Sequence, residues 1–320
     1  MKQIRKIGIL LLNLGGPERE EDVAAFLYNL FSDRQLIRLG PALLQKPLAR
    51  FIAFRRAPRS RAIYKKIGGG SPILRITRAQ ALSLERMLGN QFLVRVCMRY
   101  WHPRSQEVLK TLGNKVEQLI LLPLYPHYSR ATSGSSIDDV RTTISKLSLN
   151  LPLHIIRSWP DHPGYIACLA KRIQEGYARF DSQDVEIVYS AHSLPQRFID
   201  QGDPYVEEIR KTITALEKIT GRSGHLCYQS RSGPVAWLEP STDEMLASLA
   251  RQGRRNVLMV PISFVSDHIE TLYEINMLYR QEAKKLGIRL RSTSGLNDDP
   301  AFIDALANLV RNHISSIQDS

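Results

Sequence analysis

Residues 256–264 read N-V-L-M-V-P-I-S-F, and residues 118–126 read Q-L-I-L-L-P-L-Y-P. Each run is short and apolar, which is the pattern of a strand buried on both faces of a sheet. Strands that alternate with helices predict an α/β protein with parallel sheets. Helix-like stretches separate these two runs from four further expected strands, at residues 6–14, 92–100, 185–190 and 224–230.

The expected strands form two sets of three that resemble each other. The first set is 6–14, 92–100 and 118–126, and the second is 185–190, 224–230 and 256–264. The second and third strands of the two sets are offset by roughly 130–140 residues, whereas the first strands are offset by roughly 180. The excess of about 45 residues is close to the length of a basic segment at 34–84. We predict two similar α/β halves: residues 1–160 with this basic and apolar insertion, and residues 161–320 ending in a packed helix. Ligands of such folds bind at the carboxyl ends of the strands, here in a cleft between the halves.

The net charge of the 320-residue chain is +13, and the positive charge is concentrated in one segment. From Arg34 to Leu84 there is no Asp or Glu, and large apolar residues lie among the Lys and Arg. This composition favours an anionic partner, either a carboxylate-bearing ligand or an acidic membrane surface reached through residues 38–60. A solvated basic helix is the alternative. Nucleic acid is not expected, because the segment is not rich in aromatic residues and carries no nucleic-acid-binding motif.

Neither a membrane-spanning helix nor a disulfide framework is expected. No apolar run reaches the roughly 18 residues of a spanning helix. The short apolar run at the N-terminus is not followed by a small-residue cleavage pattern, so we expect a cytoplasmic protein. Cys97, Cys168 and Cys227 lie far apart without a C-x-x-C spacing, which argues against zinc and against an iron–sulfur cluster.

A group of ionisable residues follows the strand expected at 256–264. Residues 266–274 read S-D-H-I-E-T-L-Y-E, where a strand gives way to a helix. Asp267 and Glu270 fit a helix capping box. Asp267, Glu270 and Glu274 would also share one helix face, and carboxylates crowded at a strand end are costly unless they hold a cation or a proton. With His268 beside them, they suit a divalent first-row metal such as iron.

His192 occupies the matching place after the strand at 185–190, in S-A-H-S-L-P. A lone histidine there is more often structural than functional. If the two strand ends open on the same cleft, however, His192 and Glu270 face each other, which pairs a proton acceptor with a carboxylate that can hold a cation. The other strand ends carry Tyr, Trp, Leu and Arg but no phosphate-binding motif, so we expect a large, flat, apolar ligand with anionic edges.

Seven motifs resemble, in the same order, those of the ferrochelatase family: L-N-L-G-G-P, I-G-G-G-S-P-I, R-Y-W-H-P, L-P-L-Y-P-H-Y-S, S-A-H-S-L-P, Y-Q-S-R-S-G-P-V-A-W-L and S-D-H-I-E-T-L-Y-E. The resemblance runs from about residue 6 to residue 312. It implies two Rossmann-like halves with a porphyrin cleft between them. It also implies an enzyme that inserts Fe²⁺, as a substrate, into a porphyrin in the last steps of haem synthesis, without a permanently bound cofactor.

The resemblance implies roles for individual residues. His192 is implied as proton acceptor, metal ligand or both, and Glu270 as metal ligand or proton relay, with Asp267, His268 and Glu274 around them. Arg99 and Tyr100 are expected at the porphyrin because they stand at a strand end. The remaining positions expected to line the porphyrin or to meet its propionates are Leu14, Arg55, Arg56, Tyr64, Ser71, Tyr125 and Trp237.

Three positions bear on how this chain differs within the family. Arg130 stands where some relatives have a cluster-binding cysteine, and no cysteine follows Cys227, so no iron–sulfur cluster is predicted. Leu278 stands where the family's row of carboxylates often continues, which puts a longer proton or metal conduit along that helix in question. Leu14 stands where the coproporphyrin-using branch commonly has tyrosine, so protoporphyrin IX is the preferred substrate.

Three other functions remain open at this point. The first is insertion of iron into coproporphyrin III. The second is a porphyrin or haem carrier without chemistry, which would need the cleft but not both His192 and Glu270. The third is a chelatase for a more carboxylated tetrapyrrole such as sirohydrochlorin, which the apolar residues near 38–60 argue against. On all of these readings the basic segment allows peripheral contact with the inner face of a membrane.

Overall fold

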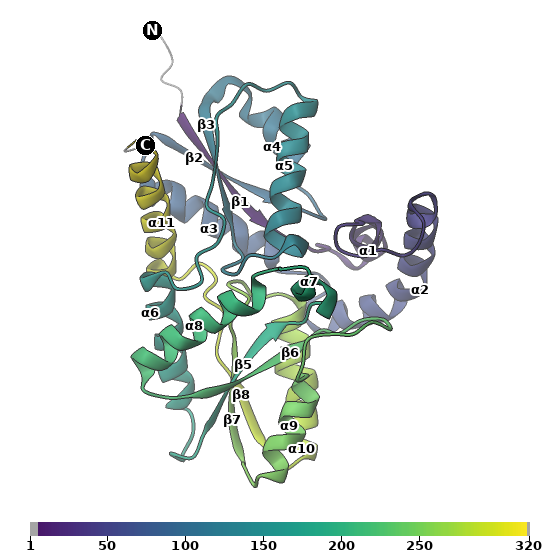
Figure 1. Ribbon diagram of the computed structural model, residues 1–320, viewed down its shortest axis with the longest axis vertical. Coiled ribbons are helices and arrows are strands. Elements are labelled where there is room, and N and C mark those ends of the chain that lie inside the picture. The colour runs from purple at the N-terminus through teal and green to yellow at the C-terminus, as the bar shows by residue number, and fades with distance from the viewer. Residues whose placement is uncertain (1–5, 319–320) are drawn as a thin grey trace. The chain divides into compact units, whose positions relative to one another are not determined.

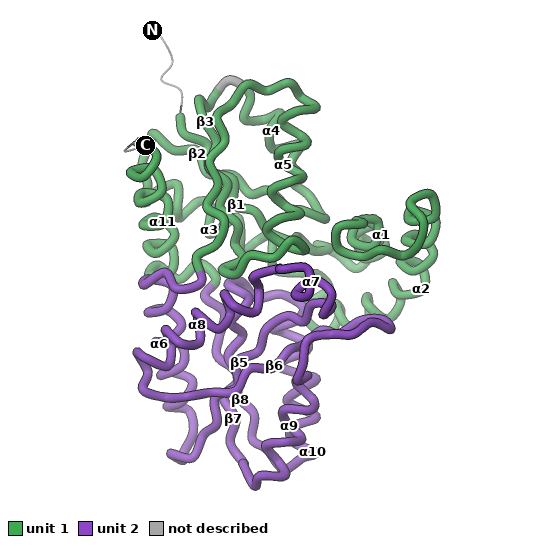
Figure 2. Tube along the Cα trace, viewed as in Figure 1, with its two compact units in different colours: residues 1–159, 297–320 green, residues 160–296 purple. Residues whose placement is uncertain are grey.

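The computed structural model describes residues 6–318 of the chain. The chain forms two compact units: Met1–Trp159 with Asn297–Ser320, and Pro160–Leu296 (Figure 2). The first unit gives way to the second between Trp159 and Pro160, next to the boundary predicted after residue 160. None of the helices within residues 6–318 combines the length and the apolar character needed to cross a membrane.

The first unit is built on a four-stranded parallel sheet in the order β2-β1-β3-β4. Central strand β1 pairs with both neighbours, so that Ile9 lies opposite Val94 on one side and Ile120 on the other. Leu10, Leu12 and other strand side chains are buried against the helices, which is why these strands are apolar along their whole length. The strands are β1 (Lys6–Asn13), β2 (Phe92–Met98), β3 (Val116–Pro123) and β4 (Leu153–Ile155).

The second unit repeats this arrangement with the order β6-β5-β7-β8, again parallel throughout (Figure 1). Its core holds Val188 of the central strand and Val257 and Met259 of the next. The predicted α/β fold with two similar halves is confirmed, and short edge strands β4 and β8 complete it. The strands are β5 (Glu186–His192), β6 (Gly224–Gln229), β7 (Asn256–Pro261) and β8 (Arg289–Ser292).

Helices cover both sheets. In the second unit the helices are α6 (Pro163–Tyr177), α7 (Gln196–Asp200), α8 (Tyr205–Thr220), α9 (Thr242–Arg251), a π-helix (Glu270–Tyr279) and α10 (Arg280–Lys285). In the first unit they are α1 (Val23–Ser32), α2 (Gln45–Lys66), α3 (Ile73–Leu88), α4 (Ser105–Leu112), a π-turn (Arg130–Gly134), α5 (Ser135–Lys146) and α11 (Pro300–Gln318).

The C-terminal helix α11 belongs to the first unit, and not to the second half to which the sequence analysis assigned it. It packs on α3, and its Arg311 donates to the carbonyl of Met87 at 3.0 Å. Phe302 is fully buried and lies 6.2 Å from the Trp159 ring. An apolar stripe predicts that a helix is packed but not which surface it packs on.

The basic segment contains α2 and most of α3. Helix α2 packs on α1, and the two form an arm that projects beside the sheet of the first unit (Figure 1). Ala49, Ala53 and Ala57, spaced four residues apart, are buried on α2 and allow the close approach. Larger apolar side chains of the same segment face solvent: Leu43 is 91% exposed, Phe54 75% and Phe51 63%.

Candidate active site

His192 is the last residue of β5, so its side chain stands at the carboxyl end of a central strand. Its backbone is held on both sides. The N–H of His192 donates to the Ser263 hydroxyl at 3.0 Å, and the Tyr205 hydroxyl donates to the His192 carbonyl at 3.0 Å. The imidazole is therefore carried by a rigid strand end and keeps 35% of its side-chain surface exposed.

Glu270 is the first residue of a π-helix that follows β7. A π-helix bonds residue i to residue i+5 and is rare outside functional sites. No side chain caps this helix, so the capping box expected from Asp267 and Glu270 is not formed. Glu270 instead turns its carboxylate to the end of β5, where its Oε2 lies 2.7 Å from Nδ1 of His192.

The His192–Glu270 pair shapes the ionisation of both groups. Burial of the imidazole would lower the pKa of His192, but the Glu270 carboxylate, its hydrogen bond and the charge of Glu274 outweigh burial and raise this pKa. Burial would raise the pKa of Glu270, but the imidazoles of His192 and His268 outweigh it and lower this pKa. The pair therefore favours a charged carboxylate next to an imidazole with increased proton affinity.

Glu274 lies one turn further along the π-helix. The Ser230 hydroxyl is 2.6 Å from Oε2 of Glu274 and 2.8 Å from Oε2 of Glu270, so it joins the two carboxylates. Burial and the charge of Glu270 raise the pKa of Glu274 to about 7. Sequence reasoning missed Ser230: it lies within the quoted motif Y-Q-S-R-S-G, but a serine in a loop carries no signal of its own.

His268 is buried beside Glu270. Its Nδ1 donates to the Ser266 carbonyl at 3.0 Å, which directs Nε2 toward Oε1 of Glu270 at 3.7 Å. The Phe264 ring lies 4.4 Å from the His268 ring and 6.3 Å from the His192 ring, measured between centroids. Glu270 is thus placed between two imidazoles, with an aromatic ring against both.

Asp267 does not share the face of Glu270 and Glu274. Its Oδ1 accepts a hydrogen bond from the Thr271 hydroxyl at 3.0 Å, and a Cβ on Gly295 would lie 3.0 Å from the same oxygen. The expectation of three carboxylates on one helix face was wrong for Asp267, because the helix begins only at Glu270 and has the wider π spacing.

Trp237 lies near the strand end that carries His192. It forms an antiparallel bridge with Pro195, and the neighbouring Leu238 N–H donates to the Leu194 carbonyl at 3.0 Å. The loop after β6 is thereby paired with the chain just after His192. The second unit therefore brings together His192, His268, Glu270 and Glu274, and it pairs Trp237 with Pro195, three residues after His192.

Two of the glycine-rich turns meet in the first unit. The Ser71 N–H donates to the Pro17 carbonyl at 2.7 Å. A Cβ on Gly16 would lie only 2.7 Å from Ser71 Cβ, so a larger residue at 16 would separate the two turns. Leu14, at the start of the first turn, is half-buried, and its carbonyl accepts the Tyr100 N–H at 2.9 Å.

Arg99 and Tyr100 are both engaged with Asp33, the residue after α1. Arg99 Nη2 lies 2.7 Å from Asp33 Oδ2, and the Tyr100 hydroxyl donates to the same oxygen at 2.8 Å. A further ion pair joins Arg99 to Asp139 at 3.3 Å. These contacts tie α1 to the end of β2, and they favour a structural role over contact with a ligand.

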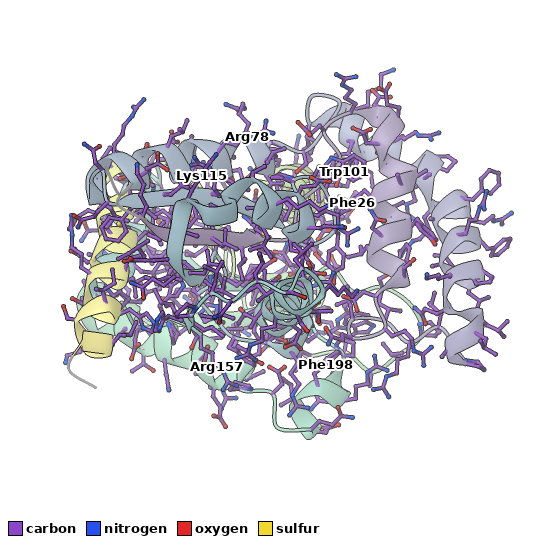
Figure 3. The ribbon with its side chains drawn as sticks, turned by 90° about the horizontal axis from the view of Figure 1, so that it is seen from above. Phe26, Arg78, Trp101, Lys115, Arg157 and Phe198 are labelled. Carbon is purple, nitrogen blue, oxygen red and sulfur yellow. The ribbon has the colours of Figure 1, made fainter. Side chains whose placement is uncertain are left out.

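Further contacts join α1 to the same strand end. Asn29 donates to the Tyr100 carbonyl at 3.0 Å. Figure 3 shows Phe26 of α1 and Trp101 in the same region of the unit. Of the other expected porphyrin residues, Arg55 and Arg56 are exposed on α2, Tyr64 is buried near its end, and Tyr125 is half-buried after β3.

Within residues 6–318 no three His, Cys, Asp or Glu side chains are grouped so as to hold a metal ion. The pair of His192 and Glu270 offers one nitrogen and carboxylate oxygens instead. Such a pair is too small for a resident metal with a full protein ligand set. It suits a metal that obtains most of its ligands from another molecule, and it also suits proton transfer, because a carboxylate orients the imidazole.

The fold resembles that of two chelatases of solved structure. Over 99% of this chain and 98% of the other, the structure superposes on SirB from Bacillus subtilis with Fe³⁺, with a TM-score of 0.55 and 12% sequence identity. It also superposes on CbiX, the terminal enzyme for biosynthesis of sirohaem in denitrifying bacteria, with a TM-score of 0.50 and 14% identity over 96% of this chain and 99% of that one. At these identities the likeness concerns the fold alone.

The sequence carries the assignment further. The model of the ferrochelatase family matches residues 6–314. A ferrochelatase of Desulfotalea psychrophila is 57% identical over 95% of this chain and 96% of its own length, and one of Geotalea uraniireducens is 50% identical over 97% and 99%. The chain belongs to the ferrochelatase family. It is accordingly an enzyme that inserts a metal ion into a porphyrin for haem synthesis.

Proposed function

We propose that this enzyme inserts Fe²⁺ into protoporphyrin IX to form protohaem, with His192 and Glu270 as the reacting pair. The observation that carries the proposal is the 2.7 Å contact between His192 Nδ1 and Glu270 Oε2. As iron enters, a free porphyrin must lose both inner N–H protons, so the site needs a proton acceptor. It needs few metal ligands, because the ring itself supplies four nitrogens.

In this mechanism Glu270 accepts the hydrogen bond of Nδ1–H and leaves Nε2 of His192 as the nitrogen that takes a porphyrin proton. The carboxylate then stabilises the imidazolium that forms, and the partly exposed ring passes this proton to water before it takes the second one. The raised pKa of His192 and the lowered pKa of Glu270 both support this division of roles. Oε1 of Glu270, on the side of His268, is the oxygen we assign to the incoming Fe²⁺. Glu274 and His268 support Glu270.

The choice of protoporphyrin IX rests on Leu14, an apolar residue in the L-G-G-P turn against Ser71. We propose that the turn meets an apolar edge of the ring, and that the exposed guanidinium groups of Arg55 and Arg56 bind propionates, because the planar fork of a guanidinium matches a carboxylate. Tyr64, Tyr125 and Trp237 are proposed as further porphyrin contacts, and Arg99 and Tyr100 as residues that position the porphyrin-binding arm.

We propose that the protein works in the cytoplasm and touches the inner face of the membrane through residues 38–60. The support is the exposed apolar side chains Leu43, Phe51 and Phe54 among arginines of the same segment. Apolar side chains flanked by basic ones suit an anionic lipid surface, from which an insoluble porphyrin would be collected.

We also propose that no iron–sulfur cluster is bound. The chain has three cysteines, and all three are buried in the interior. Burial raises the pKa of Cys97 to about 12 and that of Cys227 to about 11, which keeps both as thiols and not as the thiolates that a cluster requires. Iron analysis and the absorption spectrum of the protein purified under anaerobic conditions test this point.

The substrate assignment is tested by an anaerobic assay. Purified protein receives Fe²⁺ and either protoporphyrin IX or coproporphyrin III, and loss of the free-porphyrin absorbance bands is followed. Rapid loss with protoporphyrin IX supports the proposal. Turnover with coproporphyrin III alone would keep the enzyme class and overturn the use of Leu14 as the indicator of substrate.

A further inference from the structure

The Ser230 hydroxyl lies between the carboxyl groups of Glu270 and Glu274. It directly follows β6, and its Oγ lies 2.8 Å from Glu270 Oε2 and 2.6 Å from Glu274 Oε2. Gln229, the preceding residue, lies further from Glu270, with Nε2 3.5 Å from the same Oε2. Ser230 is thus the main hydrogen-bonding link between the end of β6 and the first turn of the π-helix.

The backbone of Ser230 is in the left-handed region, with φ of 67°. Such a φ is uncommon for a residue with a Cβ, and glycine is the usual choice because it adopts the conformation without steric cost. Residues held in such conformations cluster at active sites and ligand clamps. The conformation alone does not mark a function, since exposed Ser148 shares it, but at Ser230 it coincides with a hydroxyl that contacts two carboxyl groups.

Both carboxyl groups lie within hydrogen-bonding distance of the one Ser230 hydroxyl. A serine donates one hydrogen bond at a time, while its oxygen accepts others. The two carboxyl groups that it joins repel one another in this partly buried site when both are ionised. The Ser230 hydroxyl offsets this repulsion and fixes Oε2 of Glu270, the oxygen that also faces His192.

We propose that Ser230 is a positioning residue for metal insertion: through one hydroxyl it holds Glu270 against His192 and ties Glu274 to the same point. This inference rests on the proposed roles of His192 and Glu270. It predicts that loss of the hydroxyl leaves porphyrin binding intact, because Ser230 acts on the carboxylates, and slows turnover, because Glu270 no longer keeps its orientation.

Two substitutions separate the hydroxyl from the backbone. Ser230→Ala removes the hydroxyl and keeps the strained conformation, whereas Ser230→Gly removes the hydroxyl and relieves the strain. We expect both variants to lose about 10- to 100-fold in kcat, as for other groups that orient a metal ligand. The KM for porphyrin and the porphyrin affinity, measured by fluorescence quenching, should stay unchanged. The melting temperature should be higher for the Gly variant than for the Ala variant.

Ser148 provides the matched control. It also has a left-handed backbone, with φ of 49°, but it is exposed after α5 in the first unit. Ser148→Ala and Ser148→Gly should repeat the difference in melting temperature between Ala and Gly and leave kcat at the wild-type value.

The inference is overturned if Ser230→Gly turns over like the wild-type protein, because the serine then serves only the turn. It is also overturned if kcat in the two variants follows their melting temperatures. His192→Ala and Glu270→Gln are measured in the same series. If these two keep full turnover, the proposed roles of His192 and Glu270 fail; if they lose turnover and Ser230→Gly does not, only the role of Ser230 fails.

Discussion

Nδ1 of His192 lies 2.7 Å from Oε2 of Glu270, although the two residues are 78 positions apart in the sequence. The contact joins the end of β5 to the start of the π-helix that follows β7. Strands β5 and β7 are neighbours in one sheet. Parallel strands bring their carboxyl ends to the same edge, so a site of this kind needs no long insertion. The imidazole and the carboxylate are thereby held on rigid elements of one unit.

The pKa of His192 is expected to fall when Glu270 loses its charge. In Glu270→Gln the lowering effect of burial is opposed only by the more distant charge of Glu274. A titration of the histidine ring signals by NMR should place the pKa of His192 in the variant below its wild-type value. An unchanged pKa would show that the pair is not electrostatically coupled in solution.

Glu274 should make stability depend on pH near neutrality. Its pKa is about 7 in the folded protein against an ordinary value of 4.5. The folded chain therefore binds this proton more tightly, and the corresponding stability is fully present below pH 4.5 and lost as the pH rises through about 7. Glu274→Gln has no charge to bury at any pH.

Melting temperatures of wild type and Glu274→Gln from pH 5 to pH 8 measure this effect. The difference in melting temperature should grow in favour of the variant as the pH rises, and it corresponds to at most about 3 kcal/mol in the free energy of unfolding. A difference that stays constant over this range would mean that Glu274 titrates at its ordinary pKa.

We expect substitution of Arg99 to lower the free energy of unfolding more than it lowers the affinity for porphyrin. Arg99→Met leaves the Asp33 carboxylate, whose side chain is just 8% exposed, with neutral donors in place of the guanidinium: the Tyr100 and Ser135 hydroxyls and the Gln35 N–H. Breaking a buried pair of this kind costs about 3–5 kcal/mol. Arg95→Met is the control, because Arg95 pairs with Glu85 at a site where both side chains are about a third exposed or more, and such a pair contributes about 1 kcal/mol or less.

Denaturant unfolding of both variants tests the assignment of Arg99. A large loss for Arg99→Met and a small one for Arg95→Met supports a structural role. If Arg99→Met keeps its stability and loses porphyrin affinity, Arg99 contacts the ligand directly, as first expected from its place at a strand end.

Vesicle binding should depend on the exposed phenylalanines of α2. The double variant Phe51→Ser with Phe54→Ser removes the two large exposed rings and keeps all the basic residues. Co-sedimentation with anionic vesicles should fall well below the wild-type level. Leu82→Ser is the control. Leu82 is 57% exposed, comparable to Phe51, but lies on α3, outside the arm formed by α1 and α2. Equal binding by all three proteins would rule out the proposed membrane contact.

The sequence predicted the sheets better than the segments around them. Long apolar strands such as β3 and β7 are recognisable because both faces are buried. The edge strands β4 and β8 have only three and four residues, of which all but Leu290 are exposed or half-buried, and carry no comparable pattern. The placement of α11 depends on which apolar surface it meets, which its own residues do not encode.

The site was predictable in its residue types and less so in its geometry. His192, His268, Glu270 and Glu274 were identified from their place at strand ends and from family motifs. Asp267 was misplaced because an α-helical spacing was assumed where the chain forms a π-helix. Ser230 was not predicted, because its contacts with Glu270 and Glu274 depend on how the loop after β6 folds, which a serine in a loop does not indicate.

The central claim is that His192 and Glu270 act as one unit in metal insertion, and a double-mutant cycle on kcat tests it most directly. Variants His192→Ala, Glu270→Gln and the double variant are compared with wild type in the anaerobic iron assay. Residues that act as a unit show strongly non-additive effects. The double variant should therefore be about as slow as the slower single variant. Losses that multiply in the double variant would show that the two residues act independently and would contradict the account.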